Sequence, residues 1–157
     1  AAAELHPTLL SYFCTMSEEL YPVVTVRKDR VASIQRKHPW IFSKGIISAP
    51  ELSDGDLVTV CTKEGDFLGI GHFHFNSIAV RILSFESRLI DLDFWKERLA
   101  LCFESRKIKG LPGDDTNAYR LVHGEGDNLS GLIIDIYNHV AVIQCHSVGM
   151  HRNIDKI

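Results

Sequence analysis

Hydrophobic and polar residues alternate along the first half of the chain, in short runs that turn residues separate. VVTV and LVTVCT are β-branched and alternating, which is typical of strands. SDGD (53–56) and KEGD (63–66) carry the glycine and aspartate of tight turns. The pattern therefore predicts a series of short strands, at 23–26, along WIFSKGII (40–47), and at 57–62, 67–75 and 78–85.

One segment between these strands has a helical period. In RVASIQRKH (30–38), Val31 and Ile34 fall on one face of a helix, with His38 near the same stripe. We expect Pro39 to end this helix, because the residue before a proline is pushed out of the helical region. Short strands with one short helix predict a closed, β-barrel-like module of about 65 residues.

The period changes after residue 90 and predicts a longer helix over 91–110. Asp91 is a suitable N-cap, and the helix would end at Lys109 and Gly110, which suit a C-terminus. Its apolar stripe is expected to face a core. The stripe consists of Leu92, Trp95, Leu99 and Cys102, widened by Phe94 and Leu101.

The last part of the chain predicts two more strands. LIIDI (132–136) and VAVIQC (140–145) flank a YNH turn, and a helical start follows from residue 149. Because both runs are apolar at nearly every position, we expect a sheet covered on both faces. One helix and a few strands are too little to close a domain, so we expect a truncated unit that exposes an apolar patch or forms a homodimer.

These patterns predict an α+β fold in three parts. Residues 1–21 would be a poorly ordered extension, with Met16 as a possible natural start. Residues 22–90 would form the barrel-like module, and residues 91–157 would begin a small α/β connecting domain.

Composition restricts the class of protein. The 157 residues are 45% hydrophobic and 24% charged, as in soluble globular proteins, and no apolar run approaches the roughly 20 residues of a membrane helix. The N-terminus lacks the pattern of a secretory signal. Successive cysteines lie more than 40 residues apart, which favours buried thiols in a cytoplasmic protein over disulfides or zinc. We expect no membrane partner.

Charge is uneven along the chain although the net charge is only −3. Residues 23–48 carry six cations against Asp29 alone, and residues 49–93 carry a balance of −5. RKHPWIFSKG (36–45) gathers cations around an aromatic ring, which suits RNA phosphates and unpaired bases. The candidate RNA-binding residues are Arg27, Lys28, Arg30, Arg36, Lys37, His38, Trp40 and Lys44.

Two interpretations of this stretch remain open. The cations could face RNA, which we favour, or they could be solvated charges around a buried tryptophan. Trp40 could stack on a base, but we expect it to be a core residue at the corner between helix and strand.

Two other groups of residues could carry chemistry. His72 and His74 point the same way on one strand and could bind a metal, but the sequence offers no third ligand. Glu125 and Asp127 lie in a glycine-flanked turn before Asp135, where acid–base work is possible but a turn bonded to its own backbone is expected. Just before them, Arg120 and His123 could touch RNA or brace a further domain.

Several motifs together resemble one family. RKHPWIFSKGI, the GDFLGIGHF hairpin, IAVRILSF and YRLVHGEGDNLSGLIIDIY are similar to the N-terminal part of the bacterial S-adenosylmethionine-dependent 23S ribosomal RNA cytosine-C5 methyltransferases. The resemblance covers about residues 22 to 155. It implies a PUA domain, which is an RNA-binding β-pseudobarrel, then a small α/β domain and a Rossmann-like catalytic domain.

The resemblance has departures. The chain has Asn128-Leu129-Ser130-Gly131 where the family usually has Gly-Leu-Pro-Gly, and it lacks the family's basic residue and glycine near Ile136 and Asn138. We expect no catalytic residue, no metal and no bound cofactor here, while S-adenosylmethionine is implied for the full-length family protein. The alternatives are a stand-alone RNA-binding adaptor, or a small hydrolase or metal enzyme that uses His72, His74 and Glu125.

Overall fold

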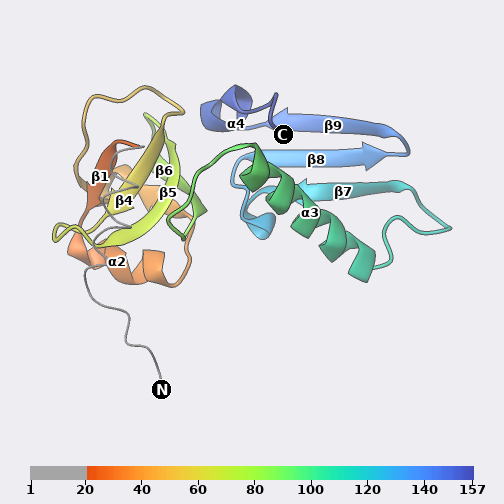
Figure 1. The fold of residues 1–157 in the computed structure, drawn as a ribbon, viewed down its shortest axis with the longest axis horizontal. Helices are drawn as coiled ribbons and strands as arrows, with labels where there is room; N and C mark the ends of the chain where they lie inside the picture. The colour runs from red at the N-terminus through yellow and green to blue at the C-terminus, as the bar shows by residue number, and fades with distance from the viewer. Residues whose placement is uncertain (1–20) are drawn as a thin grey trace, which may run out of the picture. The chain divides into compact units, whose positions relative to one another are not determined.

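The computed structural model describes residues 21–157 and divides the chain into two compact units (Figure 1). The first unit runs to Arg88 and the second begins at Leu89. Strands dominate the first unit, and a long helix accompanies a small sheet in the second, so the predicted α+β class is confirmed. Cys14 and Met16 lie outside the described residues. None of the helices within 21–157 is long and apolar enough to cross a membrane.

In its described part, residues 21–88, the first unit is a six-stranded sheet with one α-helix, α2 (Lys28–Gln35). The sheet order is β2-β6-β5-β4-β1-β3, and every pair is antiparallel except β1 with β4. The predicted strands are confirmed within one or two residues, except that a 3₁₀ turn, η1 (Ser43–Gly45), interrupts the WIFSKGII stretch. The strands are β1 (Val23–Val26), β2 (Trp40–Phe42), β3 (Ile46–Ser48), β4 (Leu57–Cys61), β5 (Phe67–Phe73) and β6 (Ile78–Ser84).

One face of this sheet packs into a hydrophobic core with α2. Ile34 of the helix is 2% exposed and joins Val24, Val58 and Val80, none of which is exposed. At Gly71 of β5 there is no room for a side chain, because a Cβ would overlap the carbonyl oxygen of Arg81. Only glycine fits such a contact, because a Cβ there would overlap the backbone of β6.

The end of α2 differs from the prediction. The helix ends at Gln35 rather than at Pro39, because Lys37 adopts a left-handed conformation with φ of 68°. The Lys37 N–H donates to the carbonyl of Ile34 and the His38 N–H donates to that of Ser33. This pair of bonds is the Schellman motif, which normally places glycine where this chain has lysine.

The second unit begins with α3 (Leu92–Ile108), for which Asp91 is the N-cap as predicted. Its carboxylate accepts a 3.0 Å hydrogen bond from the N–H of Phe94. The predicted apolar stripe is wrong at two positions, because Leu92 is 47% and Leu101 is 55% exposed. The buried positions are Phe94, Trp95, Cys102 and, one turn after Cys102, Arg106.

An antiparallel sheet in the order β7-β8-β9 completes the second unit. Its strands are β7 (Ala118–His123), β8 (Leu132–Tyr137) and β9 (Val140–Cys145), with η2 (Gly124–Asp127) after β7 and α4 (Val148–Arg152) at the end. We did not predict β7, because its sequence, AYRLVH, does not alternate clearly between apolar and polar residues. The expected covering of both faces is wrong for β9, whose residues are exposed except Cys145.

Candidate RNA-binding surface

The predicted RNA-binding residues lie around the two ends of α2, and all except Trp40 are exposed. At the start of the helix, the Arg27 N–H donates to the carbonyl of Gly45 at 2.8 Å. The Arg30 side chain lies over the same glycine, 3.0 Å from where a Cβ would stand. These contacts bring Arg27 and Arg30 beside the η1 turn that carries Lys44, and we call these three residues the α2–η1 cluster.

An aspartate reduces the charge of the α2–η1 cluster. Asp29 accepts a hydrogen bond from Arg27 at 3.1 Å and lies 3.2 Å from Arg30. The hydrogen bond from Arg27 lowers the pKa of the Asp29 carboxyl, so it is ionised at neutral pH. Three cations and one anion leave the cluster with a net charge of +2.

The other end of α2 forms a second group, in which cations contact aromatic rings. The Lys37 ammonium lies 4.7 Å from the centre of the Phe85 ring. The His38 ring meets the Trp40 ring edge-on, with centroids 6.1 Å apart, and its Nδ1 accepts the N–H of Trp40. Arg36 caps the helix beside them.

Trp40 is half-buried in β2, so the expectation of a core residue is wrong. It pairs across the sheet with Arg81 of β6, whose guanidinium lies 5.8 Å from the Trp40 ring centre. Arg81 and Phe85 were absent from our predicted set, although an arginine inside the apolar run IAVRILSF is a visible signal. We call Arg36, Lys37, His38, Trp40, Arg81 and Phe85 the ring surface.

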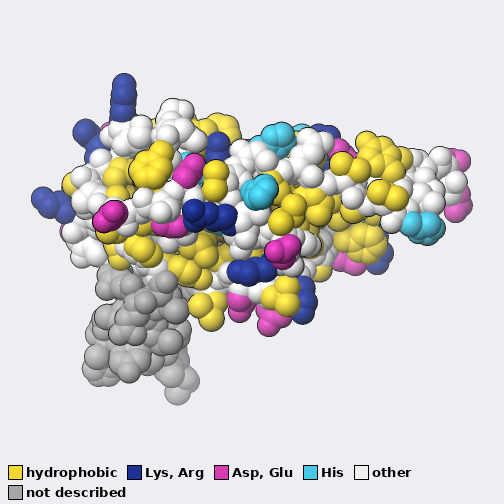
Figure 2. Space-filling model, turned by 90° about the horizontal axis from the view of Figure 1, so that it is seen from above, with side chains coloured by type: hydrophobic (Ala, Val, Ile, Leu, Met, Phe, Trp, Pro, Cys, Tyr) yellow, Lys and Arg dark blue, Asp and Glu magenta, His cyan; other side chains and the backbone are white. Residues whose placement is uncertain are grey.

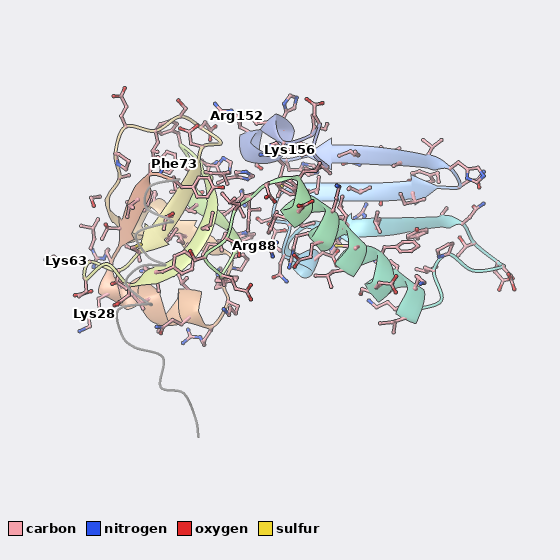
Figure 3. The ribbon with its side chains drawn as sticks, viewed as in Figure 1. Lys28, Lys63, Phe73, Arg88, Arg152 and Lys156 are labelled. Atoms are coloured by element: carbon pink, nitrogen blue, oxygen red, sulfur yellow. The ribbon has the colours of Figure 1, made fainter. Side chains whose placement is uncertain are left out.

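Lys28 belongs to neither group. It lines a depression of about 680 Å³ together with Lys63, Glu64 and Asp66. Figure 3 shows Lys28 and Lys63 at the same end of this unit. The two carboxylates balance the two ammonium groups, so this depression offers no net positive charge to a phosphate.

Positive charge on the face drawn in Figure 2 is dispersed rather than continuous. Figure 2 shows the Lys and Arg side chains of one face interspersed with neutral and acidic groups. Dispersed cations are suited to contacting individual phosphates along an RNA strand, because each cation can neutralise one phosphate.

His72 and His74, whose spacing on one strand could suit a metal, are both buried. Their rings lie 6.4 Å apart, and the Nδ1 of His74 contacts the Asp54 carboxylate at 2.9 Å. Burial lowers the pKa of His74, against the opposing effect of Asp54, and this favours the neutral ring. Within residues 21–157, no group of three His, Cys, Asp or Glu side chains is placed to hold a metal ion.

The acidic residues of the second unit are engaged in structural contacts. The Asp127 carboxylate accepts the N–H of His123 at 2.6 Å, which confirms the predicted turn, and also receives both terminal nitrogens of Arg106 at 2.6 Å. Glu125 accepts the hydroxyl of Ser130, and Asp135 accepts Arg120. Acid–base chemistry at these carboxylates finds no support, because each already serves as an acceptor within the fold.

Doubly wound folds receive nucleotide cofactors at a glycine-rich turn between a parallel strand and a helix, and the resemblance described above implies a Rossmann-like domain of this kind for S-adenosylmethionine. Within residues 21–157 there are three α-helices, and none of them begins at a glycine. Their N-cap residues are Arg27, Asp91 and Ser147. The described residues therefore do not fit this cofactor, and methyl transfer is assigned to none of them.

Comparison with known proteins agrees with this architecture. Residues 24–85 match the PUA-like domain family. The chain is similar to the ribosomal RNA large subunit methyltransferase I of Alteromonas mediterranea, at 38% identity over 85% of this chain and 34% of the relative. The protein of the same name from Aeromonas hydrophila is 40% identical over 90% of this chain and 35% of its own length. The chain thus spans about a third of the length of these relatives.

A solved structure has the same fold. A candidate SAM-dependent methyltransferase of Streptococcus mutans superposes with a TM-score of 0.74, at 20% identity over 86% of this chain and 35% of that one. Residues 24–85 are therefore a PUA-like domain, in a chain that is similar over most of its length to part of the large-subunit ribosomal RNA methyltransferases.

Proposed function

We propose that this chain is the RNA-recognising part of an S-adenosylmethionine-dependent methyltransferase that forms 5-methylcytosine in large-subunit ribosomal RNA. The relatives' names support the RNA and the reaction class, and the PUA-like domain supports a binding role for the first unit. The cytosine-C5 position rests on the motif resemblance described above. The free thiols of Cys61, Cys102 and Cys145 fit a reducing, cytoplasmic location.

The observation that carries the RNA-binding proposal is the ring surface. Cations and aromatic rings lie side by side there, and Arg36 and Lys37 have no carboxylate partner within the described residues. Phosphates need cations, and unpaired bases need flat apolar partners. An arrangement that offers both suits a structured RNA with unpaired bases.

Charge reversal at Arg36, Lys37 and Lys44 tests the proposal. If about three to five cations each neutralise one phosphate, the slope of log K against log salt should be roughly −2 to −4. The triple glutamate variant should bind structured RNA more weakly and flatten that slope by about 2. RNA titration at several salt concentrations measures both quantities.

A matched control separates this surface from general charge. Lys63→Glu removes a cation of the same unit from the balanced depression, so it should change the slope by less than any single member of the triple variant. Circular dichroism should give the same spectrum for all variants, because exposed charges contribute little to stability. Unchanged RNA affinity in a folded triple variant would contradict the proposal.

The cofactor is assigned to the longer protein. S-Adenosylmethionine would supply the methyl group there, whereas residues 21–157 offer no fitting turn. We expect calorimetric titration of this chain with S-adenosylmethionine to give no saturable heat. Micromolar binding would place a cofactor site within this chain.

Self-association through the second unit is also proposed. Val140 and Val142, which point to the same face of β9, are 60% and 42% exposed. A second copy could bury this surface. Light scattering at rising concentration should show a growing mass, and Val142→Glu should abolish that growth.

A further inference from the structure

A pocket at the end of β5 has no role in the function proposed so far. It has a volume of about 510 Å³ and is lined by side chains of η1, β3, β5 and the β5–β6 turn. Figure 3 shows Phe73, one of its walls, at the opposite end of the unit from Lys63. Its volume lies within the range of about 300–1,000 Å³ that is usual for small-ligand sites.

The pocket has an aromatic wall that solvent reaches. Phe75 is 68% exposed, and its ring meets Phe73 edge-to-face at a centroid distance of 5.0 Å and an angle of 89°. Phe73 belongs to the core and is only 8% exposed, so it fixes the position of Phe75 from below. A held aromatic ring with most of its surface open is suited to stacking with a second flat ring.

Polar groups stand beside that wall. The Ser43 N–H donates to the carbonyl of Ser77 at 2.9 Å, which ties η1 to the β5–β6 turn. The Asn76 side-chain oxygen accepts the N–H of Ile78 at 2.9 Å, so its amide nitrogen remains available to donate. With the Ser43 hydroxyl, these groups match the acceptor and donor atoms along the edge of a nucleobase.

The η1 turn, whose Ser43 lines the pocket, also carries or contacts positively charged residues. Lys44 follows Ser43 directly and is exposed, and Arg27 and Arg30 contact Gly45 of the same turn. The α2–η1 cluster is therefore next to the pocket mouth. Charge next to an aromatic wall favours a nucleotide, which carries a flat base and an anionic phosphate, over an apolar peptide.

We propose that this pocket binds one unpaired nucleobase of the RNA, stacked on Phe75 with its edge facing Asn76 and Ser43, while Lys44 contacts the adjoining phosphate. The inference rests on the RNA-binding function proposed above and adds a base-binding site to it. It predicts a preference for single-stranded segments over continuous duplex, because a paired base cannot enter a pocket.

The test uses the whole chain and a short single-stranded RNA that contains 2-aminopurine, a base whose fluorescence falls on stacking. Binding should quench this fluorescence. Phe75→Ala should abolish the quenching and weaken single-strand binding by roughly 5- to 150-fold, the range for loss of one base stack. Its affinity for duplex RNA should not change.

Two further variants separate stacking from apolar bulk. Phe75→Trp should restore quenching and affinity, whereas Phe75→Leu should not. Phe103→Ala, at a 39% exposed phenylalanine beside Glu104 on α3, is the matched control and should bind like the original chain.

The outcomes distinguish this inference from the function on which it rests. If folded Phe75→Ala binds the single-stranded RNA as tightly as the original chain and still quenches the 2-aminopurine fluorescence, the proposed base-binding site is wrong. If the salt dependence of binding is retained in that variant, the RNA-binding function itself is still supported. If the original chain binds neither single-stranded nor duplex RNA, both proposals are wrong.

Discussion

Three cations of the first unit and two arginines of the second are used in opposite ways. In the first unit, Arg36, Lys37 and Lys44 are exposed and have no carboxylate partner within the described residues. In the second unit, Arg106 donates to both oxygens of Asp127 and Arg120 donates to both oxygens of Asp135. The number of arginines in a segment therefore does not indicate a nucleic-acid surface, because partners decide whether a cation is available to bind.

Removal of the buried ion pair between Arg106 and Asp127 should have the largest effect on stability. It tests whether the paired arginines of the second unit serve its structure. Arg106 and Asp127 are each 11% exposed, and Arg106 also donates to the carbonyl of Arg120. Asp127→Ala would leave a buried guanidinium uncompensated, so we expect a loss of about 3–5 kcal/mol in the free energy of unfolding of the second unit.

Urea denaturation measures this loss. The chain has two tryptophans, with Trp40 in the first unit and the fully buried Trp95 in the second. In a Trp40→Phe background, fluorescence follows the second unit alone. A midpoint that Asp127→Ala leaves unchanged would contradict a structural role for the pair.

The same pair should make the second unit sensitive to acid. Burial opposes the charge of Asp127, but hydrogen bonds from Arg106 and the His123 N–H lower its pKa below the ordinary 3.8. A lowered carboxyl pKa stabilises the fold above the unfolded pKa, and this stabilisation is lost as the pH falls below about 3.8. Urea midpoints across acidic pH should fall less steeply in Asp127→Asn than in the original chain.

Trp40→Ala tests whether the ring surface of the first unit binds RNA. Because Trp40 is half-buried, the change should leave the first unit folded, with a smaller loss than the roughly 3–5 kcal/mol of a core tryptophan. If Trp40 stacks on a base, RNA affinity should fall by about 1–3 kcal/mol. Thermal melting and RNA titration measure the two effects separately. Global unfolding would restore the core interpretation.

The smallest effect is expected for the partly exposed pair of Arg120 and Asp135 in the second unit. The Arg120 side chain is 43% exposed and Asp135 is 13% exposed, so solvent reaches this pair from the arginine side. Arg120→Ala should cost only about 0.2–1 kcal/mol of unfolding free energy. It also serves as the control for Asp127→Ala, and an equal loss in both variants would remove the distinction between buried and exposed pairs.

Local patterns in the sequence were sufficient to predict most elements. Alternation located five strands of the first unit, and the spacing of Asp91 before an apolar stripe located α3. β7 was missed, because its pairing with β8 depends on the opposite strand rather than on its own alternation. The predicted end of α2 was wrong, because the two Schellman hydrogen bonds end the helix at Gln35, before Pro39 could do so.

The candidate site was less predictable, because it depends on contacts between distant residues. Arg81 reaches Trp40 through the register of β2 and β6, and Phe85 reaches Lys37 from the end of β6. Arg106 meets Asp127 from 21 positions away. One signal was available, since Arg106 follows Cys102 by four residues and so continues the buried face of α3.

The left-handed backbone of Lys37 has a consequence for engineering this protein. A residue with a Cβ in that conformation costs roughly 1–2 kcal/mol relative to glycine. Glycine at this position would thus be an obvious choice for raising heat tolerance. It would also remove the ammonium group over Phe85. A screen that selects only for survival at high temperature would therefore enrich variants with a more stable helix end that have lost a cation of the proposed RNA-binding surface.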